Sequence, residues 1–286
     1  MNFTEQAVTF RCAEEELLGI LALPEQPEAV GVLVVVGGPQ YRVGSHRQFL
    51  QLSRVLAGAG YPIMRFDYRG MGDGTGDQRN FEDVNEDIRA AIDALCANCP
   101  QVKRVVLWGL CDGASASLLY CDATLDSQVS GLVLLNPWVR SGTSLAHTRI
   151  KHYYGQRLMQ VDFWRKLLTG KLGLARAICG FVDNLKVVRQ KRTLTAADQA
   201  LPFQERMARG LQLFTGQVLL LLSGNDFTAK EFLETFQADK AWAAIHEQSK
   251  VARIDIPGAD HTFSTVGWRR QVEEITKRWL ETRVGQ

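Results

Sequence analysis

The chain has 286 residues, of which 46% are hydrophobic and 22% are charged, and its formal net charge is +2. These values are ordinary for a soluble globular protein and favour one large α/β domain with an insertion over two equal domains. The longest apolar runs, residues 30–36 and 218–222, are too short to cross a bilayer, which excludes a membrane-spanning chain.

Strand-like and helix-like segments alternate along most of the chain. A β-hairpin is predicted first, over residues 7–11 and 17–23, around the acidic turn Glu14–Glu16. Apolar runs then predict six buried strands, at residues 30–36, 62–66, 102–108, 129–135, 217–222 and 251–256. Helices are predicted at residues 45–57 with Ser45 as the cap, 84–96, 114–120, 229–236 and 266–281. This alternation predicts the fold class α/β, with a mostly parallel central sheet flanked by helices.

The alternation stops between Val139 and Gly210, where no strand-like run is found. We interpret residues 139–210 as a helical lid inserted after the strand at residues 129–135, which is the sixth when the two hairpin strands are counted. The core is then made of residues 1–138 and 211–286. The predicted lid carries 14 Lys and Arg against 4 Asp and Glu, and its residues 149–168 mix basic, aromatic and leucine side chains. Such a surface suits an anionic carrier or anionic lipid, although a solvated lid face is the plainer alternative.

Residues 1–6 have no basic stretch and no apolar core, so the sequence predicts no secretory signal. We therefore expect a cytoplasmic protein, with peripheral contact at the inner membrane surface through the basic lid. Its six cysteines are then expected to be reduced thiols: Cys12, Cys96, Cys99, Cys111, Cys121 and Cys179. Cys96 and Cys99 form a single Cys-x-x-Cys without a second pair, so we expect solvent-side thiols there and no metal. No nucleic-acid fold signature accompanies the basic stretch, and no nucleic-acid partner is expected.

One segment carries the pattern of an activated nucleophile. The strand predicted at residues 102–108 runs into Gly109-Leu110-Cys111-Asp112-Gly113, and small residues that can start a helix follow. A turn this tight between strand and helix strains the backbone of its central residue and leaves no room for bulk beside it. It presents the Cys111 thiol at a helix N-terminus, which favours a thiolate.

A thiol nucleophile needs a base, and the base needs an orienting acid. Among the five histidines only His261 follows the last predicted strand, in a loop that Pro257 and Gly258 force to turn. Asp226 lies where the preceding strand ends, so we assign it the acid role; its alternative is an N-cap for the next helix. Asp260 precedes His261 directly, and because adjacent side chains rarely face each other, we interpret it as a loop residue.

An oxyanion hole is expected from backbone N–H groups. One is the N–H of Asp112, and the other comes from Gly37-Gly38-Pro39-Gln40, where Pro39 has no N–H. The donor is then Gly38 or Gln40, with Gln40 favoured. We expect a substrate-binding mouth nearby; its predicted members are Tyr41, Arg42, His46 and Trp138, and the alternative for the first three is a loop and helix-cap role.

The glycine-dense segment Gly70-Met71-Gly72-Asp73-Gly74 is not followed by Lys-Ser/Thr, so it does not fit a phosphate-binding loop. Asp67 and Arg69 are expected to brace it.

With these motifs together, the chain resembles the α/β-hydrolase superfamily over nearly its full length, and more distantly the cysteine-bearing dienelactone hydrolases. Four strings look like the narrower exosortase-A-system-associated hydrolases, type one; they are residues 37–40, 66–73, 108–113 and 259–264. That resemblance implies an α/β-hydrolase fold and an enzyme that serves bacterial exopolysaccharide and protein sorting. One departure is Gly37-Gly38, where His-Gly is common before the oxyanion loop.

The sequence therefore predicts an acyl hydrolase. Cys111 attacks an ester, thioester or lactone carbonyl of a small-molecule substrate, and water activated by His261 releases the acyl-thioenzyme. No cofactor and no metal is expected. Two alternatives stay open: an acyltransferase that uses the same residues, and a catalytically idle binding module in an exopolysaccharide or protein-sorting pathway.

Overall fold

The computed structural model describes residues 2–37, 40–140, 201–238, 242 and 250–284. Within them, eight strands form one sheet: β1 (Phe3–Cys12), β2 (Glu15–Pro24), β3 (Val30–Val35), β4 (Ile63–Asp67), β5 (Arg104–Leu110), β6 (Val129–Leu135), β7 (Gln217–Ser223) and β8 (Val251–Ile256). Their order is β1-β2-β4-β3-β5-β6-β7-β8. The pairs β1–β2 and β2–β4 are antiparallel and all others are parallel, which is the α/β-hydrolase fold.

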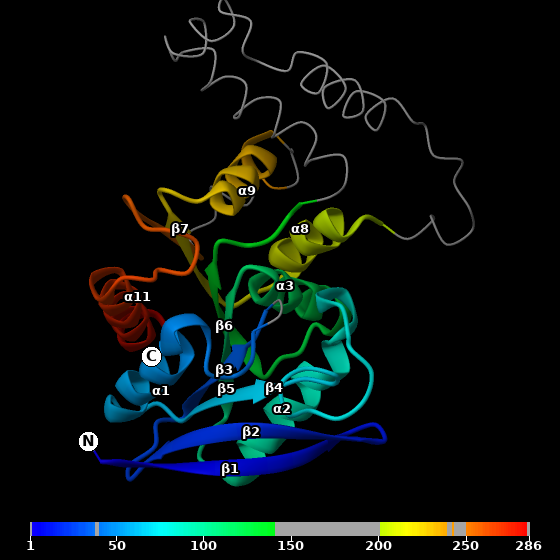
Figure 1. Cartoon of the computed structure of the whole chain (residues 1–286), viewed down its shortest axis with the longest axis vertical. Helices are drawn as coiled ribbons and strands as arrows, with labels where there is room; N and C mark the ends of the chain where they lie inside the picture. Colours follow the sequence, from blue (N-terminus) through cyan, green and yellow to red (C-terminus); the bar gives the residue numbers. More distant parts are fainter. Residues whose placement is uncertain (1, 38–39, 141–200, 239–241, 243–249, 285–286) are drawn as a thin grey trace, which may run out of the picture. The chain divides into compact units, whose positions relative to one another are not determined.

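Helices cover both faces of this sheet. They are α1 (Gln48–Gly58), α2 (Asn85–Asn98), α3 (Asp112–Thr124), α8 (Phe203–Leu213), α9 (Phe227–Ala238) and α11 (Val266–Trp279). Figure 1 shows α1 and α11 on one side of the sheet and α2, α3 and α8 on the other. Because both faces are covered, parallel strands such as β3 and β4 are buried along their whole length.

The apolar face of α1 shows how the sequence pattern becomes packing. Phe49, Leu52 and Leu56 lie three or four residues apart, as predicted, and each is at most 2% exposed. The Phe49 ring meets the buried ring of Trp108 on β5 edge-on, with centroids 5.6 Å apart. This contact fixes the helix over the strand that leads to Cys111.

The start of this helix differs from the prediction, because Ser45 is not its cap. Residues Ser45–Arg47 form a 3₁₀ turn without a side-chain cap, and α1 begins at Gln48. The carbonyl of Val43 accepts hydrogen bonds from the N–H groups of Phe49 and Leu50, at 3.2 and 3.3 Å. The backbone carbonyl of Val43, rather than the predicted Ser45 hydroxyl, therefore accepts hydrogen bonds from N–H groups in the first turn of α1.

Two further predictions were wrong in detail. Glu15 and Glu16 are paired in the hairpin with Cys12 and Arg11, so the turn is shorter than the acidic stretch suggested. Cys99 is buried at 1% exposure and Cys96 is half-buried, rather than both facing solvent. The chain folds back after α2, with the Val102 N–H donating to the Cys99 carbonyl, and so covers that thiol.

The described cysteines are all free thiols: Cys12, Cys96, Cys99, Cys111 and Cys121. Cys179 lies outside the described residues. Within those residues, no helix is both long and apolar enough to cross a membrane.

The chain divides into two compact units, one of Met1–Trp138 with Pro202–Gln286 and one of Val139–Leu201. Residues 141–200 of the predicted lid, including its basic and aromatic stretch, lie outside the described residues. Residues 203–210 belong to α8, which packs on α3 so closely that a Cβ at Gly210 would lie 2.3 Å from the Leu118 carbonyl oxygen. The lid over residues 139–210 stays a prediction.

A buried ion pair braces the loop that follows β4. The backbone N–H and Nε of Arg69 donate to Asp87 Oδ1 at 2.9 and 3.0 Å, and Nη2 donates to Oδ2 at 2.7 Å. The side chains of Arg69 and Asp87 are 5% and 0% exposed. Asp67 accepts hydrogen bonds from the N–H groups of Arg42 and Asp73, at 2.7 and 3.2 Å. The predicted bracing role of Asp67 and Arg69 is confirmed.

We predict that Asp87→Asn lowers the free energy of unfolding by about 3 kcal/mol, because it leaves the Arg69 charge buried beside a neutral partner. Glu86 also pairs with Arg69, at 2.9 Å, but its side chain is 73% exposed. Glu86→Gln is the matched control and should cost less than about 1 kcal/mol. Urea denaturation of both variants measures the difference, and equal costs would contradict the prediction.

Candidate active site

The loops that carry the predicted site residues all leave the same edge of the sheet. Cys111 follows β5, Asp226 follows β7 and His261 follows β8, while Gly37 follows β3. Since β3 to β8 run parallel, their carboxyl ends face one side, which is where open α/β sheets bind ligands. The topology therefore brings Cys111 and His261, which are 150 positions apart in the chain, to the same edge of the sheet.

Cys111 has the strained backbone that the sequence pattern predicts. It is the N-cap of α3 and adopts φ 59° and ψ −124°. Such a conformation is costly for a residue with a side chain and persists only when neighbouring structure enforces it. The Cys111 N–H donates to the Leu135 carbonyl on β6 at 2.8 Å, and its carbonyl accepts from Ala114 and Ser115. The thiol is half-buried at the first turn of the helix.

Three glycines make room for this turn, and each is irreplaceable for a steric reason. A Cβ at Gly109 would lie 2.5 Å from the backbone carbon of Gly113, and one at Gly113 would lie 2.3 Å from the Val35 carbonyl oxygen. A Cβ at Gly37 would lie 2.2 Å from Asp112 Oδ1. The predicted role of the elbow glycines is confirmed, and Gly37 serves the same packing from the neighbouring loop.

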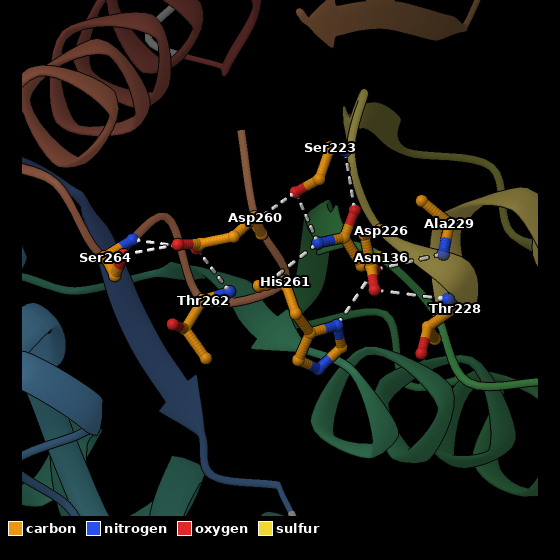
Figure 2. Close-up of polar contacts among 9 residues, drawn as sticks. All are labelled: Asn136, Ser223, Asp226, Thr228, Ala229, Asp260, His261, Thr262 and Ser264. Carbon is orange, nitrogen blue, oxygen red and sulfur yellow. Dashed lines mark hydrogen bonds and ion pairs between the residues drawn. The ribbon is translucent and has the colours of Figure 1, made fainter. Parts of the chain in front are cut away.

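Asp226 and His261 are joined directly. The Asp226 Oδ2 and His261 Nδ1 atoms are 2.8 Å apart, as Figure 2 shows. Asp226 also accepts hydrogen bonds from the N–H groups of Thr228 and Ala229, at 3.2 and 3.1 Å. One carboxylate is thus both the hydrogen-bond partner of the ring and the N-terminal cap of α9; the cap is confirmed, and the catalytic role of Asp226 stays a prediction.

The electrostatics of this pair favour charge on both groups. Burial raises the pKa of Asp226, but hydrogen bonds from His261, Ala229 and Thr228 outweigh it and hold that pKa below its usual value. Burial lowers the pKa of His261, but hydrogen bonds with Asp226 and with Cys111 raise it overall to about 10. The ring is then protonated at neutral pH. Cys111 is thus one of the groups that act on the His261 ring, and the catalytic roles of Cys111, Asp226 and His261 stay predictions.

Asp260 takes no part in this chain. Its carboxylate accepts hydrogen bonds from the N–H groups of Thr262 and Ser264, at 3.2 and 3.0 Å, and from the Ser264 hydroxyl. It stabilises the histidine loop from the side facing away from Asp226 (Figure 2). The prediction that Asp260 is a loop residue is confirmed.

The predicted oxyanion loop is described only in part, because Gly38 lies outside the described residues. Gln40 uses its side-chain oxygen to accept a hydrogen bond from the Ser45 N–H, at 3.3 Å, which ties the loop to the turn before α1. The close approach of Gly37 to Asp112 and Gly113 brings this loop against the first turn of α3. The assignment of the donors Asp112 and Gln40 or Gly38 stays a prediction.

The predicted mouth residues have different environments. The Arg42 guanidinium pairs with Asp67 and, at 2.7 Å, with Asp73, which favours the loop role over substrate binding. Tyr41 is 47% exposed and His46 is exposed. Trp138 meets the elbow through its backbone: its N–H donates to the Cys111 carbonyl at 3.3 Å, and its carbonyl accepts from the Ser115 hydroxyl at 2.7 Å.

A pocket of about 440 Å³ opens beside the elbow. Asp112 lines it together with Tyr68, Met71 and Phe81 from the loops that follow β4. The described part of the chain holds no group of three or more His, Cys, Asp or Glu arranged to bind a metal ion.

Asn136, the residue directly after the strand predicted at residues 129–135, is a member of the site that the sequence pattern did not single out. This residue adopts φ 44° and is fully buried. Its side chain bonds to Ser223 and to the His261 backbone. The available signal was an asparagine directly after a buried strand, because asparagine is one of the few residues that tolerate a left-handed backbone.

Comparisons with known proteins fit this geometry. Residues 27–262 match a family described as serine aminopeptidase, S33. An esterase from Pyrococcus furiosus superposes with a TM-score of 0.65 and 15% identity, over 98% of this chain and 92% of that one. A dienelactone hydrolase from Anabaena variabilis gives 0.62 and 16%, over 99% of both chains. Est1E from Butyrivibrio proteoclasticus, solved with ferulic acid, gives 0.62 and 14%, over 98% and 100%. A comparison with curated protein sequences found no significant match.

The packing around the elbow generates a stability prediction. We predict that Gly113→Ala lowers the free energy of unfolding by at least about 2 kcal/mol, because the new Cβ collides with the backbone of β3. Gly58 is also helical but has no atom within 4 Å of a built Cβ, so Gly58→Ala is the matched control and should be neutral or stabilising. Thermal and urea unfolding of the pair decide; a tolerated Gly113→Ala would contradict the steric argument.

A second prediction concerns the charge of His261. A histidine whose folded-state pKa is raised stabilises the protein fully below its unfolded value of about 6.5, and that contribution is lost as the pH rises toward 10. Asp226→Asn keeps a cap for α9 but removes the carboxylate, so the pKa of His261 should fall well below 10. NMR titration of the ring carbons measures it. Asp260→Asn is the control that should leave the ring unchanged, and an unchanged His261 in Asp226→Asn would refute the assigned cause.

Proposed function

Because the chain belongs to the serine aminopeptidase S33 family of α/β-hydrolases, we propose that it is an acyl hydrolase in which Cys111 replaces serine as the nucleophile. His261 is its acid–base partner and Asp226 orients the ring. The observation that carries the proposal is the strained Cys111, with φ 59°, at the same edge of the sheet as a histidine whose Nδ1 is 2.8 Å from a buried carboxylate. Cys111 is also among the groups that raise the pKa of this histidine. A fold without catalytic use has no physical need for this combination.

In the proposed reaction, the Cys111 sulfur attacks the carbonyl carbon of an ester, thioester or lactone. An imidazolium next to the sulfur balances negative charge on it, so the pair can react as thiolate and imidazolium. The oxyanion that forms accepts hydrogen bonds from the backbone at Asp112 and from the loop after Gly37. His261 then gives its Nε2 proton to the leaving oxygen or sulfur, the bond to the leaving group breaks, and an acyl-thioenzyme remains.

Deacylation reverses the roles. Neutral His261 takes a proton from water, the hydroxide attacks the thioester carbon, and the carbon–sulfur bond breaks to release a carboxylic acid. Asp226 keeps Nδ1 protonated throughout, so that Nε2 faces the reacting atoms. If an alcohol or amine enters in place of water, the same residues transfer the acyl group, which is the acyltransferase alternative.

The class of substrate is proposed from three sources. The structural relatives named above include an esterase, a dienelactone hydrolase and a protein solved with ferulic acid, all of which point to small acyl compounds. The pocket of about 440 Å³ beside Asp112 has room for such a compound. The basic stretch at residues 149–168 supports an anionic carrier or contact with an anionic inner membrane surface.

The resemblance of residues 37–40, 66–73, 108–113 and 259–264 supports a place among the exosortase-A-system-associated hydrolases, type one.

We predict that Cys111→Ala abolishes a covalent adduct that the wild-type protein forms with p-nitrophenyl acetate and with acyl thioesters. Intact-mass analysis detects the adduct, and turnover should fall by at least about 10³-fold because no other group supplies the nucleophile. Cys96→Ala, which removes a half-buried thiol on α2, is the matched control and should leave both readouts intact. Turnover that persists in Cys111→Ala would refute the proposed nucleophile. No adduct and no turnover by the wild-type protein across a broad panel would favour the idle binding module.

A further inference from the structure

Asn136 stands between two of the loops that form the site. Its side-chain nitrogen donates to the Ser223 hydroxyl at 2.8 Å and to the His261 carbonyl at 3.0 Å, and its side-chain oxygen accepts from the Ser223 N–H at 2.8 Å (Figure 2). The residue is 0% exposed, and its two bonds with Ser223 are buried. A buried amide whose donors and acceptor all have hydrogen-bond partners restricts the positions of those partners.

Ser223 extends the connection. It ends β7, three residues before Asp226, and its hydroxyl donates to the Asp260 carbonyl at 2.8 Å. Asn136 and Ser223 together therefore hold two consecutive carbonyls of the histidine loop, those of Asp260 and His261. Two backbone bonds also join the acid and histidine loops, from Gly224 to Ile256 at 3.0 Å and from Asn225 to Ala259 at 2.9 Å. Among the described residues, Asn136 is the one that bonds to the backbone of His261 itself.

The same segment reaches the nucleophile elbow. The carbonyl of Leu135, next to Asn136, accepts the Cys111 N–H at 2.8 Å, and the Trp138 N–H donates to the Cys111 carbonyl at 3.3 Å. The end of β6 and the residues after it thus contact the nucleophile elbow, the end of β7 and the histidine loop. Asn136 is the member whose side chain makes the connection, and its backbone at φ 44° aims that side chain between β7 and the histidine loop.

We propose that Asn136 is a positioning residue of this site, which holds the acid loop and the histidine loop in the register that lets Asp226 meet the ring and the ring meet Cys111. The proposal rests on the proposed function. None of the hydrogen bonds of the Asn136 side chain goes to the thiol or to the ring, so it acts through the His261 backbone and through Ser223. Asparagine suits the position because it tolerates a left-handed backbone and supplies both donors and an acceptor.

A residue that only fills the core would behave differently. Its loss would lower the free energy of unfolding and leave the reactivity of the folded site unchanged. A positioning residue, in contrast, changes the rate of the chemical step with little change in the binding of a small substrate. The reactivity of the Cys111 thiol separates the two roles without requiring knowledge of the natural substrate.

The experiment uses the full chain under native conditions. Alkylation of Cys111 by iodoacetamide is followed by peptide mass spectrometry, and kcat and KM are measured with p-nitrophenyl acetate. Asn136→Gly keeps the left-handed backbone and removes the amide, and Ser223→Ala removes one hydroxyl. The controls are His261→Gln and Asn98→Ala; the Asn98 amide also donates to a backbone carbonyl, at 2.8 Å, but lies at the end of α2.

We expect Asn136→Gly and Ser223→Ala to lower kcat and the alkylation rate of Cys111 by about 10- to 100-fold, with KM changed less than about three-fold, as is typical when a supporting hydrogen bond is lost. Asn98→Ala should match the wild-type protein. If Asn136→Gly does not fold, Ser223→Ala alone decides, because it removes a single atom. Wild-type rates in the folded variants, with His261→Gln still slowing Cys111, would overturn the positioning role and leave the proposed function standing. If His261→Gln leaves the alkylation rate unchanged, or Cys111→Ala keeps full turnover, the proposed function fails and the role of Asn136 falls with it.

Discussion

The site depends on the strained, positive-φ backbone of Cys111, at φ 59° and ψ −124°, between β5 and α3. A residue with a side chain adopts this conformation only where the surroundings forbid relaxation. Here β3, β6 and α3 enclose the turn, and Gly37, Gly109 and Gly113 let them approach to distances that no Cβ would allow. Packing of the surrounding core offsets the conformational free energy of that strained turn. Within this core, β5 carries the buried Trp108 and pairs with β3 and β6.

The two charged groups of the site, the Asp226 carboxylate and the His261 ring, are held by hydrogen bonds. Asp226 is 8% exposed, and its oxygens are held by the first N–H groups of α9 as well as by His261. A carboxylate fixed at a helix N-terminus stays ionised and cannot swing away from the ring. The orientation of the His261 ring therefore depends on the carboxylate that caps α9, so formation of that helix and the arrangement of the site are linked.

The family is described as one of serine aminopeptidases, yet the residue that we propose as the nucleophile of this chain is a cysteine. Sulfur is larger than oxygen, ionises more readily and attacks without the same dependence on a neutral base. The pKa of His261 is raised to about 10, with Asp226 and Cys111 among the groups that raise it, so the ring is the protonated member of the proposed pair.

Local sequence patterns were enough to predict the order of strands and helices along the chain, the elbow around Cys111 and the bracing roles of Asp67 and Arg69. They also predicted the acid and histidine loops and the place of Asp260 in a loop. These patterns are apolar runs, glycines beside a nucleophile, and polar residues placed directly after strands. The folded chain was needed to show that Val43 rather than Ser45 satisfies the start of α1, that Cys99 is covered, and that Asn136 joins the acid and histidine loops. Each of these depends on segments distant in the chain or on a turn whose backbone angles no residue pattern specifies. A hydrogen bond between residues 136 and 261 exists only after the sheet has placed β6, β7 and β8 side by side.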